Sequence, residues 1–148
     1  MSNTDIVQAW IKAYESHDFE GAGDLFADDF VFAGPIPDPI GKPEFIALHR
    51  ALAGALPDWT FDARGFREED DKVHFVVAVS GTFTGTLRAP FLGLDEVPPT
   101  GKAAKNPDER VTATLRGGKI ARFDVEQVPG AGVPGLLSRV GVDLPAPA

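Results

Sequence analysis

The feature that most constrains the fold of this chain is a long alternation of apolar residues in its middle. From Val73 to Phe83, side chains suited to burial stand at every second position, with Gly81 as the one small member. A period of two is typical of a β-strand that buries one face. The pattern therefore predicts one long strand over 73–83, and other elements must cover its buried face.

Three helices are expected before this strand, because apolar residues there recur at helical spacing. The Ser2–Asp5 segment can cap the first helix, which is expected to end near His17. Asp18 can cap a short second helix over 19–26, and Pro43 suits the first turn of a third helix that runs through Leu52. A short strand is predicted over 30–33, between the second and third helices.

The second half of the chain has the character of strands. Besides 73–83, strands are predicted over 59–63, 109–115 and 119–127, a loop over 88–105, and a last helical turn over 136–140. Helices followed by a run of antiparallel strands favour an α+β fold. At 148 residues, residues 1–148 fit a single domain.

The last two strands form a predicted hairpin around Gly117 and Gly118. A three-residue loop would pair Val111 with Phe123 and place Glu109 opposite Val125. The apolar face would then hold Val111, Ala113, Leu115, Ala121, Phe123 and Val125. The outer face would hold Arg110, Thr112, Thr114, Ile120, Arg122, Asp124 and Glu126. We prefer this register to a two-residue loop because the latter mixes apolar and charged residues on both faces.

Composition excludes several classes of function. The net charge of -8 argues against binding to nucleic acid or to an anionic membrane, since both require basic patches. The absence of cysteine excludes disulfides and thiol chemistry. His17, His49 and His74 have no metal-binding spacing, so no metal site and no cofactor are expected. The N-terminal residues predict no signal peptide and no apolar run spans a membrane, so we expect a cytoplasmic protein.

Several short motifs, in one order along the chain, resemble the SnoaL-like polyketide cyclases of the nuclear transport factor 2-like superfamily. They are Asp5–Trp10, Leu25–Asp29, Phe91–Gly93, Pro98–Lys102, Gly118–Ile120 and Gly135–Gly141. The resemblance implies a cone-shaped barrel, with a curved antiparallel sheet wrapped around N-terminal helices and a pocket at its open end. Relatives with this fold include cofactor-free ring cyclases, ketosteroid isomerase and proteins without demonstrated chemistry, so the fold does not settle function.

The resemblance also implies where acid–base residues would stand. In the SnoaL-like pattern an Asp lies seven residues after the hairpin glycine and a His seven before it, which here are Val125 and Val111. In the ketosteroid isomerase pattern the base aligns with Gly34 and the oxyanion donor with Trp10. Neither carboxylate is present, so the family's acid–base pair is expected to be replaced by hydrocarbon.

Three other residues remain candidates for catalysis. Glu109 is predicted on the inward face near the pocket mouth, with a solvated strand end as the alternative. Asp124 is either a displaced catalytic acid or a surface residue between Arg122 and Glu126, and the register favours the surface. Tyr14 either donates a hydrogen bond to a ligand or is a core residue. His49, on the third helix, could also reach the pocket.

The sequence therefore favours binding of a small, largely apolar or aromatic molecule. The residues expected to line its site are Trp10, Tyr14, Phe30, Leu48, Val77, Val79, Phe83, Val111, Phe123 and Val125. The alternatives are a cofactor-free cyclase or isomerase-like enzyme that uses Glu109, Asp124 or Tyr14, and a protein-interaction module. A homodimer through the outer face of the hairpin, around Ile120, is also predicted.

Overall fold

The structure is a computed structural model that describes residues 2–34, 38–90 and 93–142. Its helices are α1 (Asn3–Glu15), α2 (Phe19–Asp24), α3 (Lys42–Ala55) and α4 (Gly132–Arg139). Its strands are β1 (Phe26–Ala33), β2 (Ile40–Gly41), β3 (Arg64–Glu69), β4 (Lys72–Val77), β5 (Ser80–Thr82), β6 (Leu87–Ala89), β7 (Leu94–Val97), β8 (Ala103–Lys105), β9 (Glu109–Arg116) and β10 (Lys119–Val125). None of the described helices is long and apolar enough to cross a membrane.

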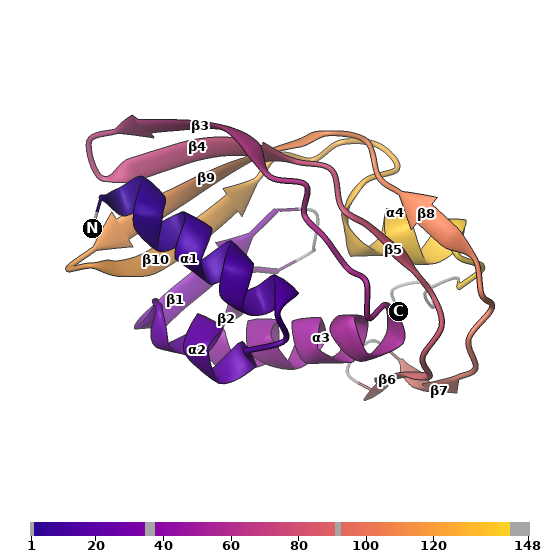
Figure 1. Cartoon of the computed structure of the whole chain (residues 1–148). Helices are drawn as coiled ribbons and strands as arrows, with labels where there is room; N and C mark the ends of the chain where they lie inside the picture. Colours follow the sequence, from indigo (N-terminus) through magenta and orange to yellow (C-terminus); the bar gives the residue numbers. More distant parts are fainter. Residues whose placement is uncertain (1, 35–37, 91–92, 143–148) are drawn as a thin grey trace.

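A curved six-stranded sheet forms the body of the fold, with the strand order β2-β1-β10-β9-β4-β3. Figure 1 shows α1 and α3 on the same side of this sheet, and α1 contacts β3, β4 and β10 while α3 contacts β1. The predicted α+β class, with N-terminal helices against a curved sheet, is confirmed. The sheet is open and does not close into a barrel. It is also mixed, because β1 pairs with β10 in parallel, which corrects the expectation of a fully antiparallel sheet.

The hairpin between β9 and β10 differs from its predicted register. The turn has two residues, Gly117 and Gly118, whose φ angles of 59° and 77° suit a tight hairpin turn. Ile120 pairs with Leu115, and a bulge at Ala121 then shifts the register. From there on the strands pair so that Val125 lies opposite Val111. Because of this extra residue in β10, Ile120 and Val125 both face inward. In a regular ladder, these two residues would lie on opposite faces of the strand.

The bulge overturns the predicted position of Ile120. This side chain is fully buried in the domain, whereas the sequence placed it on the outer face. Ala121, predicted to be inward, occupies the bulge and is only half-buried. The homodimer stays a prediction, but it loses the argument based on an exposed Ile120.

The predicted long strand over 73–83 is two strands in different sheets. Buried side chains do recur from Val73 to Phe83, but the strand is interrupted between Val77 and Ser80. Ala78 donates its backbone N–H to Phe61 at 2.8 Å, and β5 pairs with β8 instead of with β9. Alternation predicted the buried face correctly but could not show that the chain changes its pairing partner at Ala78.

Other element boundaries also differ from the predictions. The segment over 59–63 has only an isolated bridge, Thr60 with Ser80, and the strand begins at Arg64. The loop over 88–105 includes the short strands β7 and β8. The second helix ends at Asp24, and β1 begins at Phe26 because this residue already pairs with Ile120. The last helix begins at Gly132, before the predicted turn over 136–140.

The N-terminal caps form as predicted. The Ser2 hydroxyl accepts from the Asp5 N–H at 3.1 Å, and the Asp5 carboxylate accepts from the Ser2 N–H in return. Asp18 accepts from the Gly21 N–H at 3.0 Å. These caps begin α1 and α2. Trp10, on the buried face of α1, contacts five aromatic rings at centroid distances of 5.0–6.0 Å.

Candidate functional site

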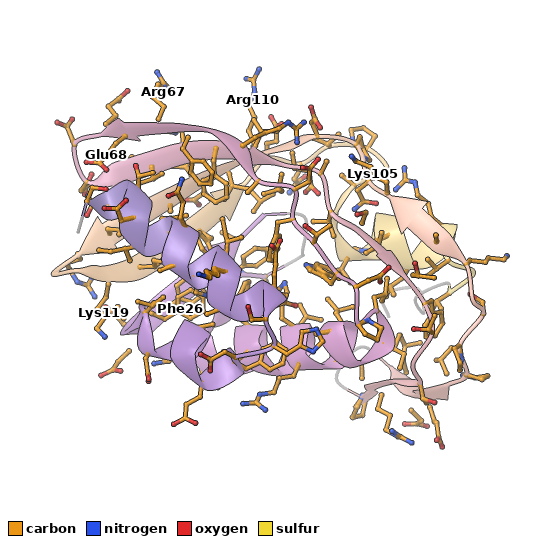
Figure 2. The ribbon with its side chains drawn as sticks, viewed as in Figure 1. Phe26, Arg67, Glu68, Lys105, Arg110 and Lys119 are labelled. Carbon is orange, nitrogen blue, oxygen red and sulfur yellow. The ribbon has the colours of Figure 1, made fainter. Side chains whose placement is uncertain are left out.

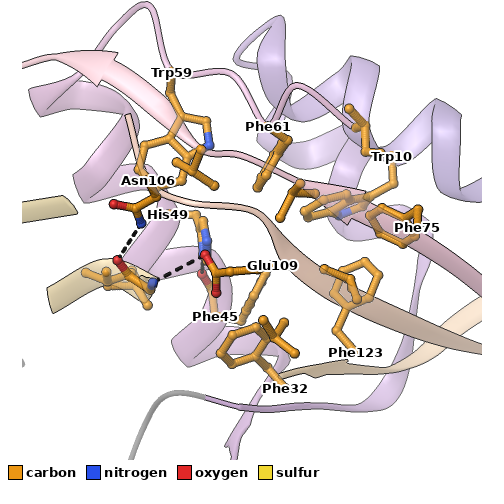
Figure 3. A pocket seen from close by; sticks show the side chains of 18 residues that line it. Trp10, Phe32, Phe45, His49, Trp59, Phe61, Phe75, Asn106, Glu109 and Phe123 are labelled. Atoms are coloured by element: carbon orange, nitrogen blue, oxygen red, sulfur yellow. Dashed lines mark hydrogen bonds between the residues drawn. The ribbon is translucent and has the colours of Figure 1, made fainter. Parts of the chain in front are cut away.

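A cavity of about 90 Å³ lies between the sheet and helices α1 and α3 (Figure 3). Its walls come from elements far apart in the sequence, because the sheet brings β4, β9 and β10 together opposite the helices. The lining side chains are Trp10, Ile11, Phe32, Phe45, Leu48, His49, Trp59, Phe61, Phe75, Val77, Val79, Asn106, Glu109, Val111, Phe123, Val125 and Val133, with Gly132 between them. Most of this surface is aromatic or aliphatic, so the cavity suits an apolar molecule.

Polar groups gather at one end of this cavity. Within the described ranges, the buried polar or charged residues are His49, Asn106 and Glu109, and all three line the cavity. Figure 3 shows the His49 ring and the Glu109 carboxylate directed toward this same end. Because buried polar groups are stable only when paired, their grouping makes this end the place where a ligand's polar atoms would be recognised.

His49 is held by its own helix. Its Nδ1 lies 3.0 Å from the carbonyl oxygen of Phe45, one turn earlier in α3. A carbonyl oxygen only accepts, so Nδ1 carries the proton. Burial of the ring lowers the pKa of His49 to about 4, although the bond to Phe45 opposes this shift. At neutral pH the ring is therefore neutral, and its Nε2 is an acceptor.

Glu109 is the first residue of β9 and pairs with Val77 of β4. Its side chain is 3% exposed, and its Oε1 accepts the Gly132 N–H at 3.3 Å. Burial raises the pKa of the Glu109 carboxyl, with a smaller contribution from the nearby negative charge of Glu126, while the Gly132 bond opposes the shift. A carboxylate with a raised pKa, in a largely apolar cavity, is suited to proton transfer.

The third polar residue, Asn106, ties the cavity to helix α4. Its Nδ2 donates to the Gly132 carbonyl at 2.9 Å, and its Oδ1 accepts from Arg139 Nη1 at 2.6 Å. Arg139 also donates to the Gly130 carbonyl. These bonds fix the beginning of α4, so Gly132 and Val133 form part of the cavity wall.

Both tryptophans of the chain have unpaired indole N–H groups. Trp10 Nε1 and Trp59 Nε1 are buried, and neither has a hydrogen-bond partner among the described residues. Both rings line the cavity. The Trp59 ring lies edge-to-face against His49, at a centroid distance of 6.0 Å. The Trp59 donor and the His49 acceptor therefore belong to neighbouring rings of the cavity wall.

The ten residues predicted to bind a ligand fall into two groups in the structure. Seven of them form part of the cavity wall: Trp10, Leu48, Val77, Val79, Val111, Phe123 and Val125. The other three, Tyr14, Phe30 and Phe83, are buried but do not line this cavity. Phe30 instead stacks on Phe26 at 3.9 Å. Residues that line the cavity and residues buried in the core both lie on inward faces. The periodic pattern of the sequence therefore cannot distinguish the two groups.

The three candidate catalytic residues have different surroundings. Glu109 enters the cavity, as described above. Asp124 lies on the other face of β10, where both carboxylate oxygens accept from Arg122 Nε at 2.9 Å. Tyr14 does not line this cavity, and its hydroxyl donates to the His49 backbone carbonyl at 3.0 Å. Burial raises the pKa of Tyr14 well above its usual value, so the phenol stays protonated.

The structure also bears on the other aligned positions. Val111 and Val125 lie opposite each other and both line the cavity. At Gly34, an added Cβ would lie 2.9 Å from the Val125 carbonyl oxygen. A side chain at position 34 therefore requires a shift of the neighbouring strand.

Several lining residues were not predicted from the sequence. They are Ile11, Phe32, Phe45, Trp59, Phe61, Phe75, Asn106, Gly132 and Val133. Phe45 lies one turn before His49, and Phe75 belongs to the alternating run, so both had a periodic signal. Asn106 and Gly132 lie outside any periodic segment, and only the tertiary structure brings them to the cavity.

Comparison with known proteins places this geometry in a family. The sequence model of the SnoaL-like domain matches residues 7–123. No curated protein matches the chain significantly. IdmH from Streptomyces antibioticus, a proposed polyketide cyclase, has a TM-score of 0.71 at 20% identity, covering 96% of this chain and 100% of its own.

Two further solved structures have the same fold. AclR from Streptomyces galilaeus, a proposed hydroxylase, has a TM-score of 0.72 at 18% identity, with 94% of this chain and 80% of that one covered. An NTF2-like protein of unknown function from Burkholderia pseudomallei has a TM-score of 0.69 at 14% identity, with 96% and 100% covered. At these identities the similarity shows the fold alone.

Proposed function

Since the chain belongs to the SnoaL-like domain family, we propose that it binds a small, largely apolar molecule in the cavity between its sheet and helices α1 and α3. The observation that carries this proposal is the composition of the wall. Aromatic and aliphatic side chains surround about 90 Å³, and the buried polar residues of the described ranges meet at one end. A site of this kind recognises the apolar body by shape and orients it by a few polar atoms.

The proposal includes the replacement of the family's acid–base pair. Val111 and Val125 stand at the positions that the resemblance aligns with the His and the Asp. Both are directed at the cavity and face each other across β9 and β10. Hydrocarbon at these two positions enlarges the apolar part of the wall, which favours an apolar ligand.

The two tryptophans provide the test. Because Trp10 and Trp59 are the chain's two tryptophans and both line the cavity, a bound molecule changes all of the indole emission. We expect saturable changes when 4-isopropylphenol or 4-isopropyltoluene is added. The variant Val77→Phe should fill part of the cavity without adding an indole, which Leu48→Trp would do. We expect Val77→Phe to weaken binding by about 10-fold or more.

A matched control is Val73→Phe. Val73 is on the same strand and is buried, but it does not line the cavity. The control separates loss of the cavity from overpacking elsewhere, because it should lower stability without a specific loss of affinity. If none of the apolar probes changes the emission of the wild-type protein, the proposed function is wrong.

A second candidate function is cofactor-free acid–base catalysis, and Glu109 is the observation that favours it. Its carboxyl is buried in the cavity wall, and burial raises its pKa. Of the three candidates, it is the one with access to a bound ligand, since Asp124 pairs with Arg122 and Tyr14 bonds to His49. Exchange of a ligand's acidic C–H with deuterium, catalysed by the wild-type protein and lost in Glu109→Gln, would support this function.

A further inference from the structure

At the polar end of the cavity, the fold fixes the protonation state of the His49 ring. His49 Nδ1 donates to the Phe45 carbonyl, so the neutral ring presents the lone pair of Nε2. Within the described part of the chain, Nε2 has no hydrogen-bond partner, while the ring is buried and lines the cavity. A ligand atom that pairs with Nε2 must therefore be a donor.

An unpaired donor lines the same cavity as this acceptor. The Trp59 N–H is buried and has no partner in the described segments, and the Trp59 ring lies at a centroid distance of 6.0 Å from the His49 ring. The Asn106 amide does not compete for a ligand, because its Nδ2 and Oδ1 are bonded to Gly132 and Arg139. An acceptor and a donor on neighbouring rings of one cavity wall fit a ligand group that can both donate and accept.

The charged residues around the cavity limit which polar group a ligand can carry. The lining residues in the described ranges include Glu109 but no Lys or Arg. A carboxylate or phosphate ligand would face the buried Glu109 carboxyl without a cation to pair with, which is unfavourable in an apolar site. A ketone accepts only, and would leave the His49 Nε2 lone pair unpaired. A hydroxyl group meets both requirements and carries no charge.

From these contacts we infer that the cavity selects neutral hydroxyl compounds, a phenol or an alcohol on an apolar body, with the hydroxyl donating to His49 Nε2 beside Trp59. This inference rests on the proposed function, since it requires that the cavity binds a ligand. It adds the polar group that the ligand must carry and its orientation: the hydroxyl lies at the His49 end, and the hydrocarbon lies toward Val77, Val111 and Phe123.

The test is a binding cycle measured by calorimetry. The two ligands are 4-isopropylphenol and 4-isopropyltoluene, which differ by a hydroxyl in place of a methyl group of similar size. The proteins are wild type and His49→Phe, which keeps a planar ring but lacks the acceptor. For each protein, the dissociation constant of the phenol is divided by that of the toluene. Comparing this ratio between the two proteins removes the hydration of the free ligands, which is the same in both.

We expect the phenol's affinity relative to that of the toluene to fall by about 10-fold in His49→Phe, the size of one buried hydrogen bond. Tyr14→Phe is the control, because Tyr14 contacts the His49 backbone but does not line the cavity. It should leave the ratio unchanged. An unchanged ratio in His49→Phe, while both ligands still bind, overturns the inference and leaves the proposed function standing. Failure of both ligands to bind wild type overturns the proposed function itself.

A second measurement does not depend on how the variants fold. In wild-type protein labelled with nitrogen-15 histidine, the His49 Nε2 resonance should have the shift of an unprotonated nitrogen at pH 7. It should move when the phenol binds and stay nearly in place with the toluene. A proton found on Nε2, or equal responses to the two ligands, contradicts the inference.

Discussion

A carboxylate at position 125 tests the orientation of β10 and the apolar character of the wall. In Val125→Asp, the new carboxyl would project into the cavity, opposite Val111. Among the residues that the structure describes, no Lys or Arg lines that cavity to pair with it. The variant should therefore be less stable than the wild type, and more so when the carboxyl is ionised.

The size of the effect follows from two contributions. Val125 is half-buried, so removing its methyl groups loses roughly 1 kcal/mol of apolar burial, about half of what full burial of a valine contributes. Burying a carboxyl without a partner adds roughly 1–3 kcal/mol. The expected loss in the free energy of unfolding is about 2–4 kcal/mol, a large fraction of the stability of an ordinary domain.

The assay is urea unfolding followed by tryptophan emission at pH 5 and pH 8. Burial raises the pKa of the new Asp in the folded state, so the folded protein binds more protons than the unfolded chain. Stability is then lost as pH rises, and the deficit should be larger at pH 8. Thr114→Asp is the control, since Thr114 lies beside Lys72, whose Nζ donates to its hydroxyl at 3.4 Å. A carboxylate there should change stability by less than about 0.5 kcal/mol.

Adding Val111→His to Val125→Asp should recover part of the loss, about 1 kcal/mol, because the two residues are cross-strand partners and their new side chains can pair. The reasoning is refuted if Val125→Asp is no more destabilising than Thr114→Asp. In that case position 125 faces solvent and Asp124 is the residue that enters the cavity.

Four further outcomes can be measured by urea unfolding. Because the pKa of Glu109 is raised in the folded state, the wild type should lose stability as pH rises above about 4.5, and Glu109→Gln should not. Parallel profiles of unfolding free energy against pH for the two proteins would contradict this. Tyr14→Phe should lose about 1 kcal/mol, one buried hydrogen bond, and leave ligand affinity unchanged. Asp124→Asn should stay within about 0.5 kcal/mol, because its pairing with Arg122 is exposed. Ile120→Ala should lose roughly 2–5 kcal/mol in the monomer, whereas a small effect would return Ile120 to the surface.

The sequence predicted the fold class and half of the apolar residues in the cavity wall because both depend on periodicity. Helical spacing in α1 and α3 and alternation in β4 and β9 determine which faces are buried. The sequence also predicted correctly that Phe123 and Val125 face inward, although it paired them with the wrong residues of β9. A hairpin's register depends on its turn and on any bulge, and nothing in the local pattern indicated that Ala121 is an extra residue.

The polar end of the site was only partly predictable. Glu109 and His49 were candidates because each was expected on an inward face. Their roles depend on contacts that no spacing indicates: the bond from His49 to Phe45 within α3, and the bond from Gly132 to Glu109 across 23 positions. No sequence pattern indicated Asn106. It lies in a loop that is held by hydrogen bonds to Val79 and to Gly132 at the start of α4.

The central claim is that a ligand occupies the cavity that both tryptophan rings line. Figure 2 shows the labelled charged side chains of Arg67, Arg110 and Lys119 pointing outward from the ribbon. The most direct measurement is a two-dimensional NMR spectrum of protein with nitrogen-15 in its two indole groups, recorded while 4-isopropylphenol is added. The account predicts that both indole N–H signals, from Trp10 and Trp59, move and saturate with one dissociation constant, equal to that from calorimetry. If calorimetry shows binding while both indole signals stay in place, the ligand binds elsewhere and the claim is wrong.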